Sequence, residues 1–288
     1  MTVAAPPNSE AAGQLPGEAA VLPLAAHENF PVALALVGRR TRAHLVAIYG
    51  FARLTDQVGD EAPGDRLALL DALEADLLRV FDGEPEHPLL RRLVPTVRAC
   101  ALPREPFLRL IEANRRDQET VAYASFDDLL GYCALSANPV GELVLQIFGA
   151  ASPERIALSD RVCTALQLVE HWQDVAEDFR RGRVYLPAED LERFGVSRTD
   201  LGAGHAGGPL RELLVFEVER ARGLLDAGAP LVGQLRGRAR LAVAGYVGGG
   251  RANADAIIAA GYDVLPGAPR ASKASRVRAI LRTAGAGR

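Results

Sequence analysis

Residues 45–61, LVAIYGFARLTDQVGDE, carry apolar side chains at the three- and four-residue intervals of a helix. Asp56 and Asp60 stand four residues apart, so a helix presents both carboxylates on one face, about one turn from each other. Arg53 and Tyr49 lie three and seven residues before Asp56 and share that face. The segment therefore predicts an apolar helix that ends in a pair of acids.

A second segment repeats this design in the other half of the chain. Residues 164–178, TALQLVEHWQDVAED, again have helical periodicity, and Asp174 and Asp178 again stand four apart. Gln167 and Glu170 precede them on the same face. We expect one continuous helix here, with its own acidic face.

The same periodicity runs from Pro31 to about Leu265, with Pro and Gly between the periodic segments. Alternating patterns joined by Asn-Gly or Asp-Gly turns, the signature of hairpins, do not occur in the sequence. We predict an all-α fold of about eight or more helices in a single domain, residues 25–267. A flexible leader, residues 1–24, precedes the domain, and a basic C-terminal tail, residues 268–288, follows it.

Composition excludes several classes of protein. The 288 residues are 49% hydrophobic and hold 33 basic and 36 acidic side chains, for a net charge of −3, which argues against a general nucleic-acid binder. No apolar run approaches the roughly 20 residues of a membrane-spanning helix. Three widely spaced cysteines, Cys100, Cys133 and Cys163, suggest neither a disulfide scaffold nor a zinc site. We expect a cytoplasmic protein.

The two acid pairs have two interpretations. Carboxylates one turn apart repel each other, and a hard divalent cation that takes oxygen ligands relieves that repulsion. Mg²⁺ typically uses a few carboxylates together with substrate phosphate oxygens, so two facing pairs suit a clamp for a diphosphate. Arg53 and the loop residue Arg183 would contact the same diphosphate. Either pair alone also fits an ordinary solvated helix face.

The residues around both pairs resemble the squalene/phytoene synthase family of head-to-head prenyl transferases. Tyr49-x-x-x-Arg53-x-x-Asp56-x-x-x-Asp60 is similar to the family's first aspartate-rich signature, and residues 173–187, QDVAEDFRRGRVYLP, resemble its second. Between them, Asp117, Tyr123, Tyr132-Cys133 and Pro139-Val140-Gly141 match a further family pattern. The resemblance covers about residues 27–265 and implies the isoprenoid synthase fold, a helical bundle around a central active-site cavity.

Within the family, His27-Glu28-Asn29-Phe30-Pro31-Val32 resembles the hydroxysqualene synthase branch, which acts in bacterial squalene and hopanoid formation. The resemblance implies a carbon–oxygen lyase that converts presqualene diphosphate and water to hydroxysqualene and diphosphate, with two or three Mg²⁺ ions and no NADPH. Two positions depart from the family pattern. Glu170 stands where relatives carry an Asn metal ligand, and Gln57 where many carry a second Asp.

Each candidate side chain has an expected role. The metal ligands are Asp56, Asp60, Glu170, Asp174 and Asp178. The groups that bind substrate are Asn29, Phe30, Arg53, Gln167, Arg183 and Arg270, the last through resemblance to a basic residue that closes over the diphosphate. The catalytic group comprises Tyr49, Arg53, Tyr132, His171 and Tyr185, in which aromatic faces stabilise a carbocation and His171 positions the quenching water. For Tyr132, Phe30 and His171, ordinary core packing remains the alternative.

The C-terminal tail holds six basic residues and no acid. Such a run is usually solvated, but residues 274–281 also suit an anionic membrane surface, which would make the protein peripheral at the inner face of the membrane. Two other functions stay open. One is a condensing enzyme that makes presqualene diphosphate, squalene or phytoene, and the other is a non-catalytic helical lipid-binding protein.

Overall fold

The computed structural model describes residues 15–16 and 37–286, and it confirms the all-α prediction. No strand occurs in these residues; the one β-type contact is an isolated parallel bridge between Ala122 and Val184. The helices in this part of the chain are α3 (Arg39–Asp60), α4 (Arg66–Asp82), α5 (Pro88–Cys100), α6 (Glu105–Glu119), α7 (Phe126–Ser136), α8 (Asn138–Ile147), α9 (Pro153–Gln173), α10 (Val175–Arg180), α11 (Ala188–Arg193), α12 (Arg198–Leu201), α13 (Gly208–Gly228), α14 (Leu231–Gln234), α15 (Gly237–Ala259) and α16 (Lys273–Ala286).

Local chemistry sets where the helices begin. The Asp65 side chain accepts a hydrogen bond from the backbone of Ala68 at the start of α4, and Ser125 forms a capping box with Asp128 at the start of α7. Ser152 caps α9, with Pro153 at the first helical position, where a missing N–H costs nothing. The Pro and Gly positions between periodic segments therefore fall at helix boundaries, as the sequence predicted.

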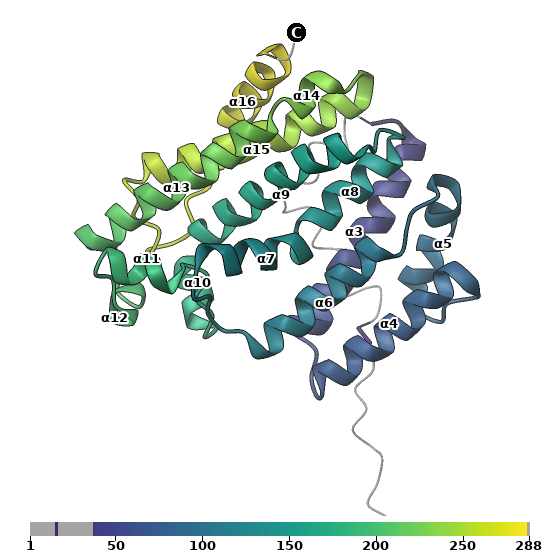
Figure 1. Ribbon diagram of the computed structural model, residues 1–288, viewed down its shortest axis with the longest axis horizontal. Helices are drawn as coiled ribbons and strands as arrows, with labels where there is room; N and C mark the ends of the chain where they lie inside the picture. The colour runs from purple at the N-terminus through teal and green to yellow at the C-terminus, as the bar shows by residue number, and fades with distance from the viewer. Residues whose placement is uncertain (1–14, 17–36, 287–288) are drawn as a thin grey trace, which may run out of the picture.

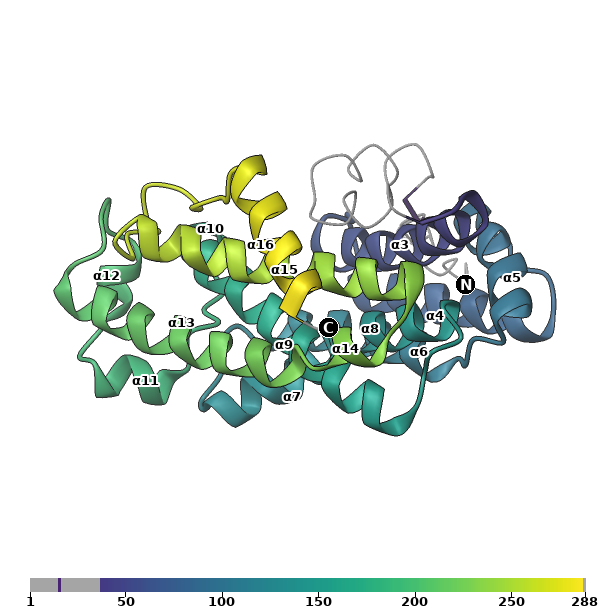
Figure 2. The same cartoon turned by 90° about the horizontal axis from the view of Figure 1, so that it is seen from above.

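Helix α9 lies at the centre of the molecule (Figure 1), with α13 and α15 on one side and α7 and α8 on the other. Helices α3 to α6 form one end of an elongated body, and α10 to α13 form the other (Figure 2). One core cluster surrounds Trp172 of α9, and a second surrounds Phe51 and Phe107 in the α3–α6 end. The two predicted acidic segments thus meet between two separately packed cores.

The second acidic segment differs from the prediction of one continuous helix. Helix α9 ends at Gln173, and α10 begins at Val175, with Asp174 in a non-helical conformation between them. The backbone N–H of Asp174 still bonds to the Glu170 carbonyl, and that of Asp178 to the Asp174 carbonyl. The break turns the last part of the motif without separating it from α9.

The C-terminal segment also differs from a free solvated run. Residues 273–286 form α16, which packs on α15 so closely that a Cβ added to Gly248 would overlap the backbone of Ile280. Arg251 of α15 donates a hydrogen bond to the buried Thr283 of α16 at 3.0 Å. No helix among the described residues is both long enough and apolar enough to cross a membrane. The basic segment therefore forms part of the folded body.

Candidate active site

The first acid pair is held by contacts between α3 and α6. Asn114 of α6 donates a hydrogen bond to Asp56 Oδ1 at 3.4 Å, and Gln118 donates to the backbone oxygen of Gly59 at 2.9 Å. Helix α6 comes this close because Gly59 has no side chain; a Cβ there would overlap the amide of Asn114. These contacts fix the last turn of α3 and with it the direction of the carboxylate of Asp60.

Tyr49 and Arg53 lie on the preceding turns of α3. Tyr49 is buried, and the Nε atom of Arg53 is shielded from solvent without a hydrogen-bond partner among the described residues. A shielded guanidinium N–H is normally paired, so an incoming anion would satisfy it. This observation supports the predicted contact of Arg53 with a diphosphate.

Arg183 connects the two acidic motifs. Its guanidinium contacts Asp60 Oδ1 at 2.8 Å, and its backbone N–H donates to the Asp178 carbonyl at 2.9 Å. The chain reverses at Gly182, whose φ of 84° lies in the left-handed region that favours glycine. The loop after α10 thereby brings a half-buried cation from the second motif onto an acid of the first.

Asp174, at the break between α9 and α10, carries a carboxyl pKa raised above its ordinary value. Burial is the main cause, and the charge of Asp178 adds to it, while Arg270 acts in the opposite direction. The amide of Gln173 donates to the backbone carbonyl of Pro269, which holds the segment carrying Arg270 against the break. Arg270 is therefore close to the second motif.

Asp117 of α6 also lies in the site, although the sequence pattern assigned it no role. It accepts a hydrogen bond from the Tyr132 hydroxyl at 2.8 Å, and its second oxygen, Oδ1, is buried without a partner in the described part of the chain. Burial raises its pKa to about 6; Tyr132 and Arg183 lower it, and the charges of Asp60 and Asp178 raise it. Asp117 therefore lies within electrostatic range of both motifs.

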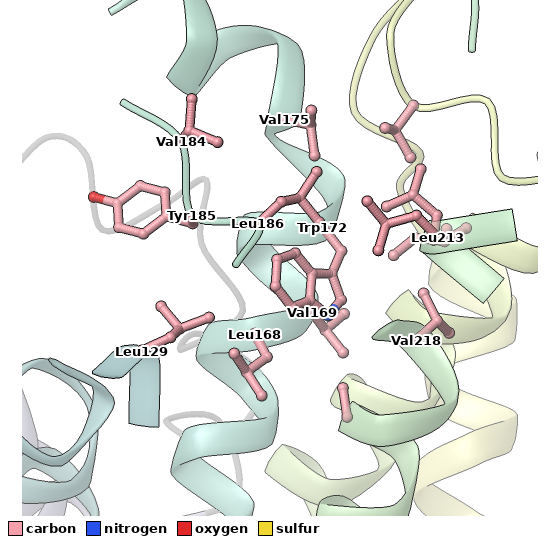
Figure 3. Packing of buried hydrophobic residues seen from close by; sticks show 14 of the residues in the cluster. Leu129, Leu168, Val169, Trp172, Val175, Val184, Tyr185, Leu186, Leu213 and Val218 are labelled. Carbon is pink, nitrogen blue, oxygen red and sulfur yellow. The ribbon is translucent and has the colours of Figure 1, made fainter. Parts of the chain in front are cut away.

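Three tyrosines and a histidine pack together beside these acids. The rings of His171 and Tyr185 stack with centroids 3.6 Å apart, and Tyr185 lies 5.8 Å from both Tyr123 and Tyr132. Burial raises the pKa of each tyrosine hydroxyl above its ordinary value, which further disfavours ionisation. In Figure 3 the Tyr185 ring points away from Trp172, which packs on the other side of the segment. The predicted residues Tyr132, His171 and Tyr185 thus form one cluster, to which the structure adds Tyr123.

His171 links this cluster to the acids. Its Nδ1 lies 3.8 Å from Asp178 Oδ2, and its Nε2 lies 3.2 Å from the amide nitrogen of Gln167. His171, Asp178, Arg183 and Tyr185 also line one small hollow. The histidine is buried, with Gln167 within hydrogen-bond distance of one ring nitrogen and Asp178 facing the other.

A cavity of about 330 Å³ adjoins these residues, enclosed mainly by α8, α9, α15 and α16. Its polar end includes predicted site residues: Gln167, Glu170, Asp174 and Arg270. The rest of the wall is largely apolar: Val140, Val144, Leu145, Val162, Leu166, Val169, Leu231, Val243 and Ile280. A ligand with a charged head and a long hydrocarbon body fits this division of polarity.

The donor set fits magnesium bound together with a ligand. In the described range, no three His, Cys, Asp or Glu side chains converge closely enough to hold a metal by themselves. Mg²⁺ commonly takes only one or two carboxylates and completes its shell with water and phosphate oxygens. Asp56 and Asp60 on one side, and Glu170, Asp174 and Asp178 on the other, supply oxygen donors of that kind. Asn29 and Phe30, also predicted to bind substrate, lie outside the described residues, as does nearly all of the predicted leader 1–24.

Fold and site together define the class: an all-α enzyme with an apolar cavity whose polar end holds the second acidic motif, to which Arg183 joins the first. The chain belongs to the squalene/phytoene synthase family, whose model matches residues 24–278. Membership supports an enzyme of isoprenoid biosynthesis that acts on prenyl diphosphates.

Individual relatives fall into more than one branch of that family. The chain is 36% identical over 202 residues to a hydroxysqualene synthase of Zymomonas mobilis, covering 69% of this chain and 67% of that protein. It is 33% identical over 228 residues to a phytoene synthase of Mycobacterium tuberculosis, covering 77% and 75%. The crystal structure of squalene synthase HpnC from Alicyclobacillus acidocaldarius aligns with a TM-score of 0.79 and 44% identity, over 85% of this chain and 94% of that one.

Proposed function

We propose that the protein is a hydroxysqualene synthase, which converts presqualene diphosphate and water to hydroxysqualene and diphosphate. The observation that carries this proposal is the cavity, which is apolar along most of its length and ends at acids and arginines. Hydroxysqualene synthases among the relatives support this branch. The reaction would belong to squalene and hopanoid biosynthesis.

In the proposed mechanism, Asp56, Asp60, Asp174 and Asp178, with Glu170 beside them, hold two or three Mg²⁺ ions. When bound, the metal supplies positive charge that stabilises the departing diphosphate. The diphosphate oxygens also accept hydrogen bonds from three arginines, Arg53, Arg183 and Arg270. These contacts fix the head of the substrate at the polar end of the cavity. The hydrocarbon body lies along the apolar wall.

The chemical step is an ionisation followed by the addition of water. The C–O bond breaks with both electrons leaving on the diphosphate, and the carbocation rearranges within the cavity. A water oxygen then bonds to the cationic carbon, and its proton passes to the released diphosphate. Tyr132, Tyr185 and Tyr49 present aromatic faces to the cation, and the apolar wall excludes bulk water. No hydride is transferred, so NADPH is not required.

Product analysis tests this proposal. Purified protein is incubated with presqualene diphosphate and Mg²⁺, with and without NADPH, and diphosphate release and product are measured. We expect hydroxysqualene in both cases, and loss of release on chelation of the metal. Asp56→Asn and Asp174→Asn should each reduce release at least about a hundredfold, because each removes a charged oxygen ligand.

The phytoene synthases among the relatives favour a second candidate, a condensing transferase that joins two prenyl diphosphates. Conversion of farnesyl diphosphate alone to presqualene diphosphate, squalene or phytoene would support that candidate and contradict ours. Absence of diphosphate release from every prenyl diphosphate would instead indicate a non-catalytic lipid-binding protein.

We also propose that the protein acts from the cytoplasm, peripherally on an anionic membrane, through the outer face of α16. Val277 and Leu281 are 54% and 68% exposed, one turn apart. The basic residues Lys273, Arg278 and Arg282 are exposed on the same helix, which has no acid. Apolar side chains between cations are typical of helices that lie in the headgroup region.

Sedimentation with vesicles tests the membrane contact. The variant Val277→Ser/Leu281→Ser should bind phosphatidylglycerol vesicles several-fold more weakly than the wild-type chain. Val121→Ser is the matched control, because Val121 is equally exposed, at 56%, but precedes α7. Equal binding by all three proteins would contradict the proposal.

A further inference from the structure

Asn253 is a polar residue on the cavity wall that belongs to neither acidic motif. It stands on α15 in register with Gly245 and Gly249, at intervals of four residues, and all three line the cavity. A Cβ added to either glycine would meet no atom within 4 Å, so this face of α15 opens onto free space. The Asn253 side chain therefore borders the open volume of the cavity.

The position of Asn253 along the cavity follows from the packing of α15 on α9. Val243 packs in the same cluster as Val162, a Cβ on Gly250 would overlap Leu166, and Ile257 shares a cluster with Trp172. Residue numbers thus rise together along the two helices. Asn253 is level with the part of α9 around Val169 and Glu170, where the wall changes from apolar to polar.

The amide oxygen of Asn253 lacks a partner. The residue is only 7% exposed, and no donor among the described residues reaches its Oδ1. A buried amide oxygen without a hydrogen bond is unfavourable, so a donor from the cavity is expected. The diphosphate of the substrate offers only acceptors and its hydrocarbon offers no donor. Water is the donor that the proposed reaction itself requires.

We infer that Asn253 positions the water that quenches the carbocation. The water donates one hydrogen to Oδ1 and turns a lone pair toward the cationic carbon. The new bond forms from the water oxygen to that carbon, and the proton lost leaves on the released diphosphate. Asn253 is thus a positioning residue: it selects addition of water over loss of a proton from carbon, which would give a polyene hydrocarbon without oxygen. This inference rests on the proposed function.

The test is the ratio of hydroxysqualene to the elimination product, which does not depend on the overall rate. Asn253→Leu matches the shape of the amide without its oxygen and should lower the ratio at least tenfold. Asn253→Asp keeps an acceptor oxygen and should restore most of it. Ile257→Val, one turn along α15 and outside the cavity wall, is the control for general disturbance of the helix.

The outcomes separate the inference from the proposed function. If wild-type protein yields hydroxysqualene and Asn253→Leu gives the same ratio, the inference is wrong and the function stands. If Asn253→Leu slows diphosphate release but leaves the product ratio unchanged, Asn253 acts in diphosphate binding or in folding. The inference is then again wrong. If wild-type protein makes no hydroxysqualene, both fail. Should Asn253→Leu not fold, as judged by circular dichroism, Asn253→Ala gives the same readout without added bulk.

Discussion

At the scale of single residues, Arg183 is the group through which the two acidic motifs contact each other. Its side chain contacts Asp60, and its backbone bonds to Asp178, so one residue holds the two motifs together. A planar guanidinium with several donors can contact Asp60 and a diphosphate together, whereas an ammonium acts as a point charge. The residue's chemistry, and not only its charge, therefore matters.

We predict that Arg183→Lys lowers the rate of diphosphate release by on the order of tenfold or more while the protein stays folded. Arg181→Lys is the matched control, because Arg181 lies in the same loop, is 61% exposed and, among the described residues, forms an ion pair with Glu177 in the adjacent α10 turn alone. Single-turnover kinetics on presqualene diphosphate provides the measurement. Equal rates of diphosphate release for Arg183→Lys and Arg181→Lys would show that the guanidinium of Arg183 has no specific role in the reaction.

At the scale of helices, close approach depends on particular glycines. Helix α6 reaches α3 because Gly59 leaves room for Asn114, whereas Gly131 on α7 faces open space. We predict that Gly59→Ala destabilises the protein by about 1–3 kcal/mol through overpacking. Gly131→Ala should stabilise it by about 0.5–1 kcal/mol, because alanine loses less backbone freedom in a helix. Urea denaturation measures the free energy of unfolding of both variants. Equal destabilisation by Gly59→Ala and Gly131→Ala would contradict the packing argument.

Two buried acids, Asp190 of α11 and Glu217 of α13, meet at Arg220 away from the cavity. Arg220 contacts Asp190 at 2.9 Å and lies 4.0 Å from the ring centroid of Phe126, which brings α7 into the same cluster. Glu217 beside them is fully buried, and burial raises its pKa to about 8, with Arg220 opposing the shift and Asp190 adding to it. This carboxyl is therefore protonated in the folded protein at neutral pH.

The consequence is a pH dependence of stability. Between the ordinary pKa of 4.5 and about 8, the folded protein keeps a proton that the unfolded chain has released. The free energy of unfolding therefore falls as pH rises through this window, by at most about 1.4 kcal/mol per pH unit from this group. We predict that Glu217→Gln removes this contribution to the slope of unfolding free energy against pH. Glu219→Gln, at an exposed position on the same helix, should leave the slope unchanged. Parallel slopes for wild type and Glu217→Gln in denaturation from pH 5 to 8 would contradict this.

At the scale of the whole molecule, most of the architecture could be predicted from periodicity. The apolar repeats and the Pro and Gly between them indicated the helices, and the second acid pair indicated the polar end of the cavity. The break at Asp174 was missed, because Val169, Trp172 and Val175 keep helical spacing across it. Only tertiary contacts, such as that of Gln173 with Pro269, distinguish a broken helix from a continuous one.

Asp117 matched a family pattern but was given no role, for a related reason. It follows two arginines on α6 and precedes Gln118 and Glu119, a polar run that is typical of a solvated helix end. Its surroundings come from segments distant in sequence, since Tyr132 donates a hydrogen bond to it and the charge of Arg183 acts on it. The basic run at the C-terminus likewise concealed α16, whose inner side chains Ile280 and Thr283 pack inward. The local sequence pattern showed that both segments are charged. Which of their side chains are buried depended on contacts with distant parts of the fold.

The central claim is that this cavity ionises presqualene diphosphate and adds water to the resulting cation. The most direct measurement is mass spectrometry of the product formed in ¹⁸O-labelled water, with Mg²⁺ and without NADPH. The account predicts hydroxysqualene that carries one labelled oxygen, together with one diphosphate released per product. An oxygen-free hydrocarbon, or no conversion of presqualene diphosphate, would contradict it.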